Sequence, residues 1–164
     1  MTINKKNNKV AIVMGSQSDY SVMKKCEEIL KTLKIKYETK IISAHRTPDR
    51  MFEFAKTAAK NNFAAIVAGA GGAAHLPGMI ASMSTLPIIG VPVETKKLKG
   101  LDSLLSIVQM PKGIPVGTVA IGEDGAFNAG LLVASIIALS DIKIKKNLQK
   151  WRRLQTAIIK KKPK

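Results

Sequence analysis

The sequence KVAIVMGSQSD, residues 9–19, predicts the architecture of the whole chain. A short apolar run that ends in glycine is typical of a strand buried on both faces of a parallel sheet. Residues 16–19 are rich in the types that cap helix N-termini, and apolar residues then recur at helical spacing from Val22 to Leu33. The stretch therefore predicts a central strand, a tight loop and a helix.

The same alternation continues along the chain. We expect further strands at 36–42, 63–68, 87–93 and 116–121, and helices at 48–61, 101–108 and 126–139, with a short helix after Met79 that runs to about Ser84. Regular βα alternation with right-handed crossovers predicts a three-layer α/β/α sandwich around a five-stranded parallel sheet. This plan is flavodoxin-like, since an eight-unit barrel needs about 250 residues.

The last part of the chain differs in kind from the rest. Residues 1–140 are predicted to form one α/β catalytic domain, and residues 141–164 a basic amphipathic helix. Its apolar stripe consists of Ile144, Leu148, Trp151, Leu154 and Ile158. Such stripes are packing faces more often than membrane anchors, so we expect this extension to pack on the same subunit or on a neighbouring one.

The formal charge of +16 raises the question of nucleic-acid binding. Ten Lys or Arg and no acid fall between 143 and 164, which leaves 17 basic against 11 acidic residues over 1–142. Basic residues are not interleaved with aromatic ones, as they are in surfaces that stack bases. We therefore expect no specific nucleic-acid partner. No apolar run reaches the ~20 residues of a membrane span, and we expect a cytoplasmic protein without a membrane partner.

Polar residues follow the first two expected strands. Residues 15–19 offer backbone N–H groups, the hydroxyls of Ser16 and Ser18 and a helix N-terminus, all of which favour an anion, while Asp19 can accept hydrogen bonds from a sugar diol. The same residues also suit a simply capped helix start. The loop 43–48 places His45 and Arg46 beside Ser43, a combination suited to proton transfer on an anionic substrate.

A glycine-rich stretch, 69–78, follows the third expected strand. Gly71 lets the backbone approach a ligand closely, and the apolar Ala70 and Leu76 would make a small, dry wall. His75 has two interpretations, because it could hold this loop through hydrogen bonds or take part in catalysis. Since carboxyl ends of parallel strands share one edge of the sheet, the three loops should meet there.

Several other chemistries lack the residues they need. Two histidines and one cysteine without ligand spacing do not suggest a metal centre. No GxSxG elbow is present, so a serine hydrolase is not suggested. Residues 15–19 form neither a Walker loop nor a GxGxxG fingerprint, so this loop does not specifically suggest ATP or a dinucleotide. Cys26 falls in a helical pattern and is interpreted as a small buried thiol.

The chain resembles the bacterial N5-carboxyaminoimidazole ribonucleotide mutases of purine biosynthesis, also described as the catalytic subunit of phosphoribosylaminoimidazole carboxylase. The resemblance covers about residues 9–139. It rests on residues 15–19, 43–48, 69–79, 90–93, 101–113 and 125–129. Phe127 departs from the family pattern, in which a smaller or basic residue is common.

The resemblance implies a reaction that moves a carboxylate from the exocyclic amine of an aminoimidazole ribonucleotide to the adjacent ring carbon, without cofactor or metal. It implies that His45 acts as acid and then as base. It further implies substrate binding by Ser16, Ser18, Asp19, Ser43, Arg46, Ala70, Gly71, His75 and Leu76. A homo-octamer is implied as well.

Two alternatives remain open from the sequence. A related carboxylase would join free carbon dioxide to the unsubstituted aminoimidazole ribonucleotide with the same fold and a similar histidine. A nucleotide- or RNA-binding α/β module without catalysis would use the same anion loop, and its affinity would fall steeply with salt.

Overall fold

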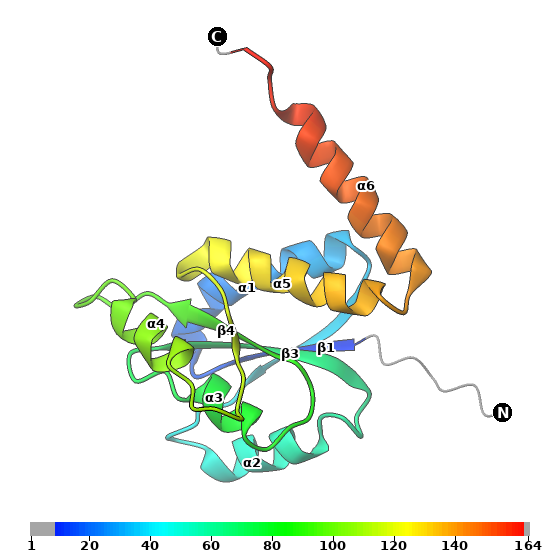
Figure 1. Ribbon diagram of the computed structural model, residues 1–164. Coiled ribbons are helices and arrows are strands. Elements are labelled where there is room, and N and C mark those ends of the chain that lie inside the picture. Colours follow the sequence, from blue (N-terminus) through cyan, green and yellow to red (C-terminus); the bar gives the residue numbers. More distant parts are fainter. Residues whose placement is uncertain (1–8, 163–164) are drawn as a thin grey trace, which may run out of the picture.

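Five parallel strands form the middle layer of the molecule, in the order β2-β1-β3-β4-β5 (Figure 1). The computed structural model describes residues 9–162. The strands are β1 (Lys9–Met14), β2 (Lys36–Ile41), β3 (Phe63–Gly71), β4 (Ile88–Val93) and β5 (Gly117–Thr118). All four neighbouring pairs are parallel. This strand order is that of flavodoxin-like folds and confirms the predicted class.

Helices cover both faces of the sheet (Figure 1). One face carries α1 (Tyr20–Thr32) and α5 (Gly122–Ala138), and the other carries α2 (Pro48–Thr57), α3 (Leu76–Ala81) and α4 (Leu101–Val108). The central strands β1 and β4 are buried on both sides because nearly every one of their residues is apolar. Helices α1 and α5 approach so closely at Gly130 that a Cβ there would lie 2.4 Å from Ile29 Cγ2.

Several element bounds differ from the expected ones at the edge of the sheet that binds ligands in this fold. Strand β3 continues through the first glycines to Gly71, and α3 starts at Leu76, so the glycine-rich loop itself is only residues 72–75. Strand β5 has two residues because only these pair with β4. Helix α5 starts at Gly122, which places Glu123 and Asp124 in its first turn, where carboxylates are favourable, rather than in a loop.

The C-terminal helix α6 (Ile142–Ile158) leans away from the sandwich (Figure 1). Asp141 caps it by accepting hydrogen bonds from the backbone N–H groups of Lys143 and Ile144. Two apolar side chains, Ile144 and Leu148, are buried in the core shared with α1 and α5. The end of the same stripe is solvent-exposed, with Leu154 55% and Ile158 68% accessible.

Cys26 lies at the contact between α1 and α5 and is fully buried, as predicted. Burial raises the pKa of its thiol well above the ordinary value, which keeps the sulfur protonated and unreactive. Over residues 9–162, no helix combines the length and apolar character that crossing a bilayer requires.

Candidate active site

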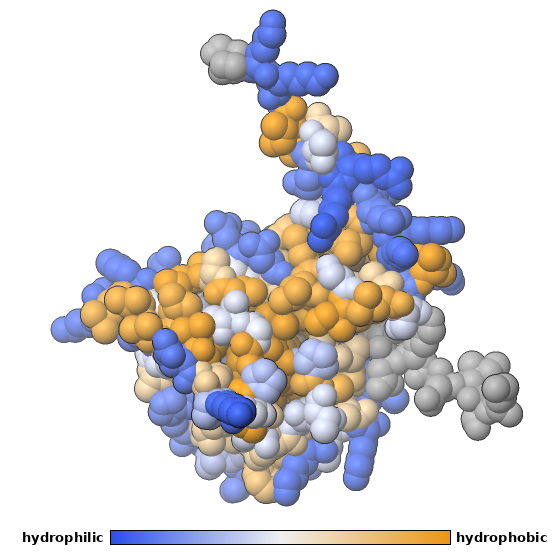
Figure 2. All heavy atoms as spheres, in the orientation of Figure 1, coloured by the Kyte–Doolittle hydropathy of each residue, from blue (hydrophilic) through white to orange (hydrophobic). Residues whose placement is uncertain are grey.

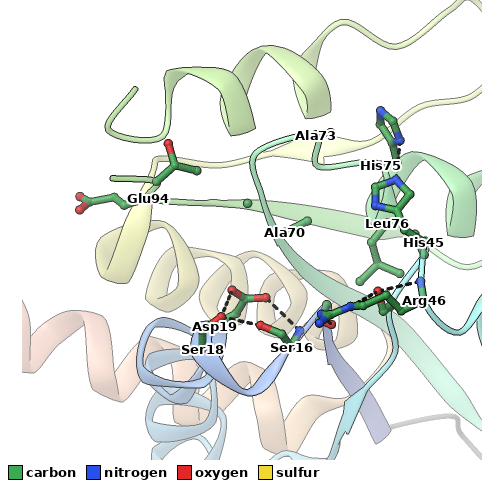
Figure 3. A pocket seen from close by; sticks show the side chains of 15 residues that line it. Ser16, Ser18, Asp19, His45, Arg46, Ala70, Ala73, His75, Leu76 and Glu94 are labelled. Atoms are coloured by element: carbon green, nitrogen blue, oxygen red, sulfur yellow. Dashed lines mark hydrogen bonds between the residues drawn. The ribbon is translucent and has the colours of Figure 1, made fainter. Parts of the chain in front are cut away.

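A pocket of about 440 Å³ opens at the carboxyl edge of the sheet (Figure 3). It is formed by the segments that follow β1, β2, β3 and β4. All ten residues singled out from the sequence line it: Ser16, Ser18, Asp19, Ser43, His45, Arg46, Ala70, Gly71, His75 and Leu76. The fold therefore brings together three loops that are far apart in the sequence, as parallel strand ends require.

The segment after β1 combines a strand end with a helix start. Ser16 caps a short 3-10 turn, Gln17–Asp19, that leads directly into α1. Its backbone N–H donates to Asp19 Oδ2 at 3.2 Å, and the Ser18 hydroxyl donates to Asp19 Oδ1 at 3.3 Å. The hydroxyls of Ser16 and Ser18 also contact each other. This side of the pocket thus presents two hydroxyls and a helix N-terminus, which suit an anion.

Asp19 is a half-buried carboxylate that lines the pocket. Burial raises its pKa above the ordinary value of 3.8, although the hydrogen bonds from Ser16 and Ser18 and the charge of Arg46 oppose that shift. The ionised Asp19 carboxylate is therefore less favourable in the free protein than it would be in water. A ligand that donates hydrogen bonds to this carboxylate would replace the hydration that burial removes.

The loop after β2 holds Arg46 in place from two sides. Its Nε donates to Ser43 Oγ at 3.3 Å, and its Nη2 donates to the carbonyl oxygen of Gly15 at 2.8 Å. Ser43 is nearly buried, and its Oγ also accepts the backbone N–H of Arg46. Arg46 therefore bridges the β1 and β2 loops, and its remaining N–H groups form no hydrogen bond within residues 9–162.

His45 and His75 meet at one side of the pocket, each from a different loop (Figure 3). Nε2 of His45 lies 2.8 Å from Nδ1 of His75, and the rings are edge to face with centroids 4.9 Å apart. One nitrogen of this contact must donate and the other accept. His75 therefore forms a hydrogen bond as the loop-holding interpretation expects, but its partner is the other candidate side chain.

The wall near the two histidines is apolar. Ala70 is buried at the end of β3, Leu76 is buried at the start of α3, and Ala73 completes the lining between them. Gly71 has no side chain to fill the space in front of this wall. The small residues leave room for a flat ligand and keep water away from one side of it.

Two residues of the pocket were missed from the sequence, Glu94 and Thr95. They directly follow β4, so their position after a predicted strand was the available signal. Thr95 Oγ1 donates to the Asp102 carboxylate at the start of α4, with both oxygens 3.0 Å away. Figure 3 places Glu94 at the end of the pocket away from the histidine pair.

Acidic residues elsewhere do not join the pocket. Glu123 lies 3.7 Å from Lys25 on the helical surface. Among residues 9–162, no group of three or more His, Cys, Asp or Glu side chains could hold a metal ion.

A model of the AIR carboxylase family matches residues 9–157, nearly the whole described chain. The chain belongs to the AIR carboxylase family. Within this family it is 56% identical over 154 residues to the N5-carboxyaminoimidazole ribonucleotide mutase of Brucella melitensis, a match covering 94% of this chain and 95% of the relative. It is 54% identical over 148 residues to the mutase of Escherichia coli K12, covering 90% of this chain and 88% of the relative.

Solved structures of similar proteins agree with the fold of this AIR carboxylase family member. A crystal structure of Treponema denticola PurE superimposes with a TM-score of 0.82 and 28% identity, covering 91% of this chain and 92% of that one. Among the curated relatives, the Bacillus subtilis protein of 57% identity over 143 residues, covering 87% of this chain and 88% of the relative, also carries the mutase name. The predicted family and fold are thus both confirmed.

Proposed function

We propose that this protein is an N5-carboxyaminoimidazole ribonucleotide mutase, which isomerises its substrate to 4-carboxy-5-aminoimidazole ribonucleotide. The observation that carries the proposal is the hydrogen-bonded His45–His75 pair at a pocket whose opposite side suits a phosphate. The mutase name carried by relatives of 54–57% identity over most of the chain supports the same choice.

His45 is the acid and the base in this proposal. It gives a proton to the exocyclic nitrogen as the carbamate N–C bond breaks and carbon dioxide leaves. The ring carbon then attacks the carbon dioxide, and His45 takes the proton that this carbon loses. One proton leaves the imidazole and one returns, so the two steps balance without an external base. The reaction is an isomerisation with no net oxidation, so it needs neither a redox cofactor nor ATP.

The β1 and β2 loops bind the nucleotide end of the substrate. Ser16, Ser18, Ser43 and Arg46 bind the 5′-phosphate, because hydroxyls, a helix N-terminus and a guanidinium are the usual partners of a phosphate. Asp19 accepts hydrogen bonds from the ribose hydroxyls. Arg46 is held by Ser43 and Gly15 before any ligand arrives, so little entropy is lost when it binds the anion.

The β3 segment binds the ring and the carboxylate. Ala70, Gly71, His75 and Leu76 surround the place where carbon dioxide must stay between the two steps. An apolar wall of small residues favours this apolar gas over water, and the backbone N–H groups near Gly71 can bind the carboxylate. Retention at this wall keeps the released carbon dioxide within reach of the ring carbon.

The test supplies each candidate substrate separately at low bicarbonate. We expect efficient turnover of N5-carboxyaminoimidazole ribonucleotide and little use of the unsubstituted ribonucleotide. Turnover of only the unsubstituted ribonucleotide would instead make the protein the direct carboxylase. Binding of both without turnover would favour a non-catalytic nucleotide-binding module.

Exposed apolar side chains support a homo-oligomer, which we propose to be an octamer. Leu101, Leu105 and Val108 form an exposed stripe on α4, and Leu154 and Ile158 another on α6. Figure 2 shows apolar side chains gathered on the side of the molecule that Figure 1 turns toward the viewer, over parts of α4 and α5. Large apolar patches on a soluble domain mark contact surfaces. The phosphorylated substrate carries charges that do not cross a bilayer, so we place this activity in the cytoplasm.

A further inference from the structure

Two serines of α4 hold Gly72, the first residue of the glycine-rich loop, from both sides. The backbone N–H of Gly72 donates to Ser103 Oγ at 2.9 Å. The Ser106 hydroxyl lies 3.1 Å from the Gly72 carbonyl oxygen and 2.7 Å from the Asp102 carbonyl oxygen, so the two acceptors share its hydrogen. Ser103 is fully buried, and its hydroxyl donates in turn to the Val93 carbonyl oxygen at the end of β4, 2.6 Å away. Both backbone polar groups of Gly72 are therefore in contact with hydroxyls of a single helix.

Gly72 needs this support because its backbone is in the left-handed region, with φ +70°. This conformation turns the chain away from β3 and directs it toward α3. Glycine adopts this conformation without steric cost, but it adopts other conformations just as readily. The hydrogen bonds to α4 therefore restrict a backbone that glycine alone would leave flexible.

The geometry of Gly72 reaches the histidine pair through a very short segment. Only Ala73 and Ala74 separate it from His75, whose Nδ1 contacts His45. Ala74 is buried, and the His75 backbone N–H donates to the Ala73 carbonyl oxygen. Both features restrict the conformations that this segment can adopt. A shift of Gly72 therefore moves the His75 ring and with it the orientation of His45.

We infer that Ser103 and Ser106 are positioning residues for the proposed reaction, and that they act by fixing Gly72 and through it the His45–His75 contact. This inference rests on the proposed function. Neither serine lines the pocket. The adjacent Asp102 accepts a hydrogen bond from Thr95, so three residues on one side of α4 hold the wall of the pocket.

Ser106 gives the cleaner test because it is exposed, so that its replacement leaves no buried polar group unpaired. Ser106→Val and Ser106→Thr introduce side chains of nearly equal shape and the same branching, but only Thr keeps the hydroxyl. Ser103→Ala is the second variant, accompanied by a thermal unfolding curve to show that it folds. Ser135→Ala is the control, because Ser135 donates to the Leu131 carbonyl oxygen within α5, away from the pocket.

The two histidines of the sequence are His45 and His75. The imidazole resonances of a sample labelled with 15N only at histidine therefore report on this pair alone. We expect Ser106→Val and Ser103→Ala to shift these resonances and to lower kcat about 10-fold, with KM changed less than about twofold. Ser106→Thr and Ser135→Ala should keep the wild-type spectrum and kcat.

Three results would overturn the inference: wild-type imidazole resonances and kcat in both Ser106→Val and Ser103→Ala, the same loss in Ser106→Thr as in Ser106→Val, or a raised KM at unchanged kcat. Failure of the proposed function looks different. The wild-type chain would then turn over only the unsubstituted ribonucleotide or neither of the two, while the imidazole spectra of the variants would still decide whether α4 positions the pair.

Discussion

The Nε2 atom of His45 lies 2.8 Å from the Nδ1 atom of His75, and the two rings meet edge to face. A single hydrogen can occupy this contact, so the tautomer of one ring determines that of the other. The pair joins the loop after β2 to the loop after β3. The relative position of the two loops therefore sets the orientation of the His45 ring.

Replacing His45 should separate chemistry from binding. In His45→Asn we expect turnover of the carbamate substrate to fall by a factor of about 10² to 10⁴, the usual contribution of a general acid or base. Binding of the ribonucleotide, measured by calorimetry, should change little, because the proposed partners of the phosphate and the ribose remain. A variant with near-normal turnover would remove His45 from its assigned role.

Replacing Arg46 should do the opposite. Arg46→Gln removes the cation but keeps a hydrogen-bonding side chain, so we expect KM to rise about 10-fold or more while kcat changes less. Arg46→Lys should recover only part of the affinity, since an ammonium cannot reproduce the bonds to Ser43 and Gly15 together with a phosphate. An unchanged KM in both variants would place the phosphate elsewhere.

Neutralising Asp19 should stabilise the free protein and weaken its function. The folded state raises the pKa of this carboxyl above 3.8, so wild-type stability falls as the pH rises through that range, where the unfolded state loses its proton first. The Asp19→Asn variant does not lose stability in this way as the pH rises. Its free energy of unfolding should exceed that of the wild type at pH 7, and the difference should shrink toward pH 3. Urea unfolding between these values measures it.

The control for Asp19 is Asp124→Asn, at an exposed position in the first turn of α5. This change should not stabilise the protein, because a carboxylate is favourable at a helix N-terminus. Equal stability of Asp19→Asn and wild type at every pH would contradict the cost assigned to burial. Weaker ribonucleotide binding by Asp19→Asn is expected in either case.

Cys26 should report on unfolding. Since burial blocks access and raises the thiol pKa, an aromatic disulfide reagent should not react with the native protein even at mildly alkaline pH. Reaction should follow the denaturant transition seen by circular dichroism, and as the only cysteine it gives one signal. Rapid labelling of the native protein would show that α1 and α5 separate readily.

Assembly should depend on the exposed apolar stripes. We expect wild-type protein at micromolar concentration to sediment as an oligomer, and Leu105→Asp or Leu154→Asp to shift it toward smaller species, because each introduces a charge into an apolar contact. Both side chains are more than half exposed in the single chain, so its own fold should tolerate the change. A monomeric wild-type profile would contradict the proposed oligomer.

Local sequence was sufficient for the elements with the strongest patterns. The apolar run 9–14 and the alternation of strands and helices that follows it predicted a parallel sheet in a flavodoxin-like fold. The three loops were indicated by their positions directly after predicted strands. The end of β3 was wrong because glycine permits both strand and loop, and the helix expected to run to residue 61 ends at Thr57. Hydrogen bonds to β4 extend β3 through Gly71, and no property of the residues alone indicates that pairing.

The sequence by itself determined most of the chemical groups at the carboxyl edge of the sheet, since a residue that follows a buried parallel strand must emerge there, although Glu94 and Thr95 were missed. It did not determine which of these groups touch. Three contacts join residues about 30 positions apart: His45 with His75, Arg46 with the Gly15 carbonyl oxygen, and Ser103 of α4 with the Gly72 N–H. Such contacts depend on the order and spacing of strands in the sheet, which only the packed tertiary structure decides.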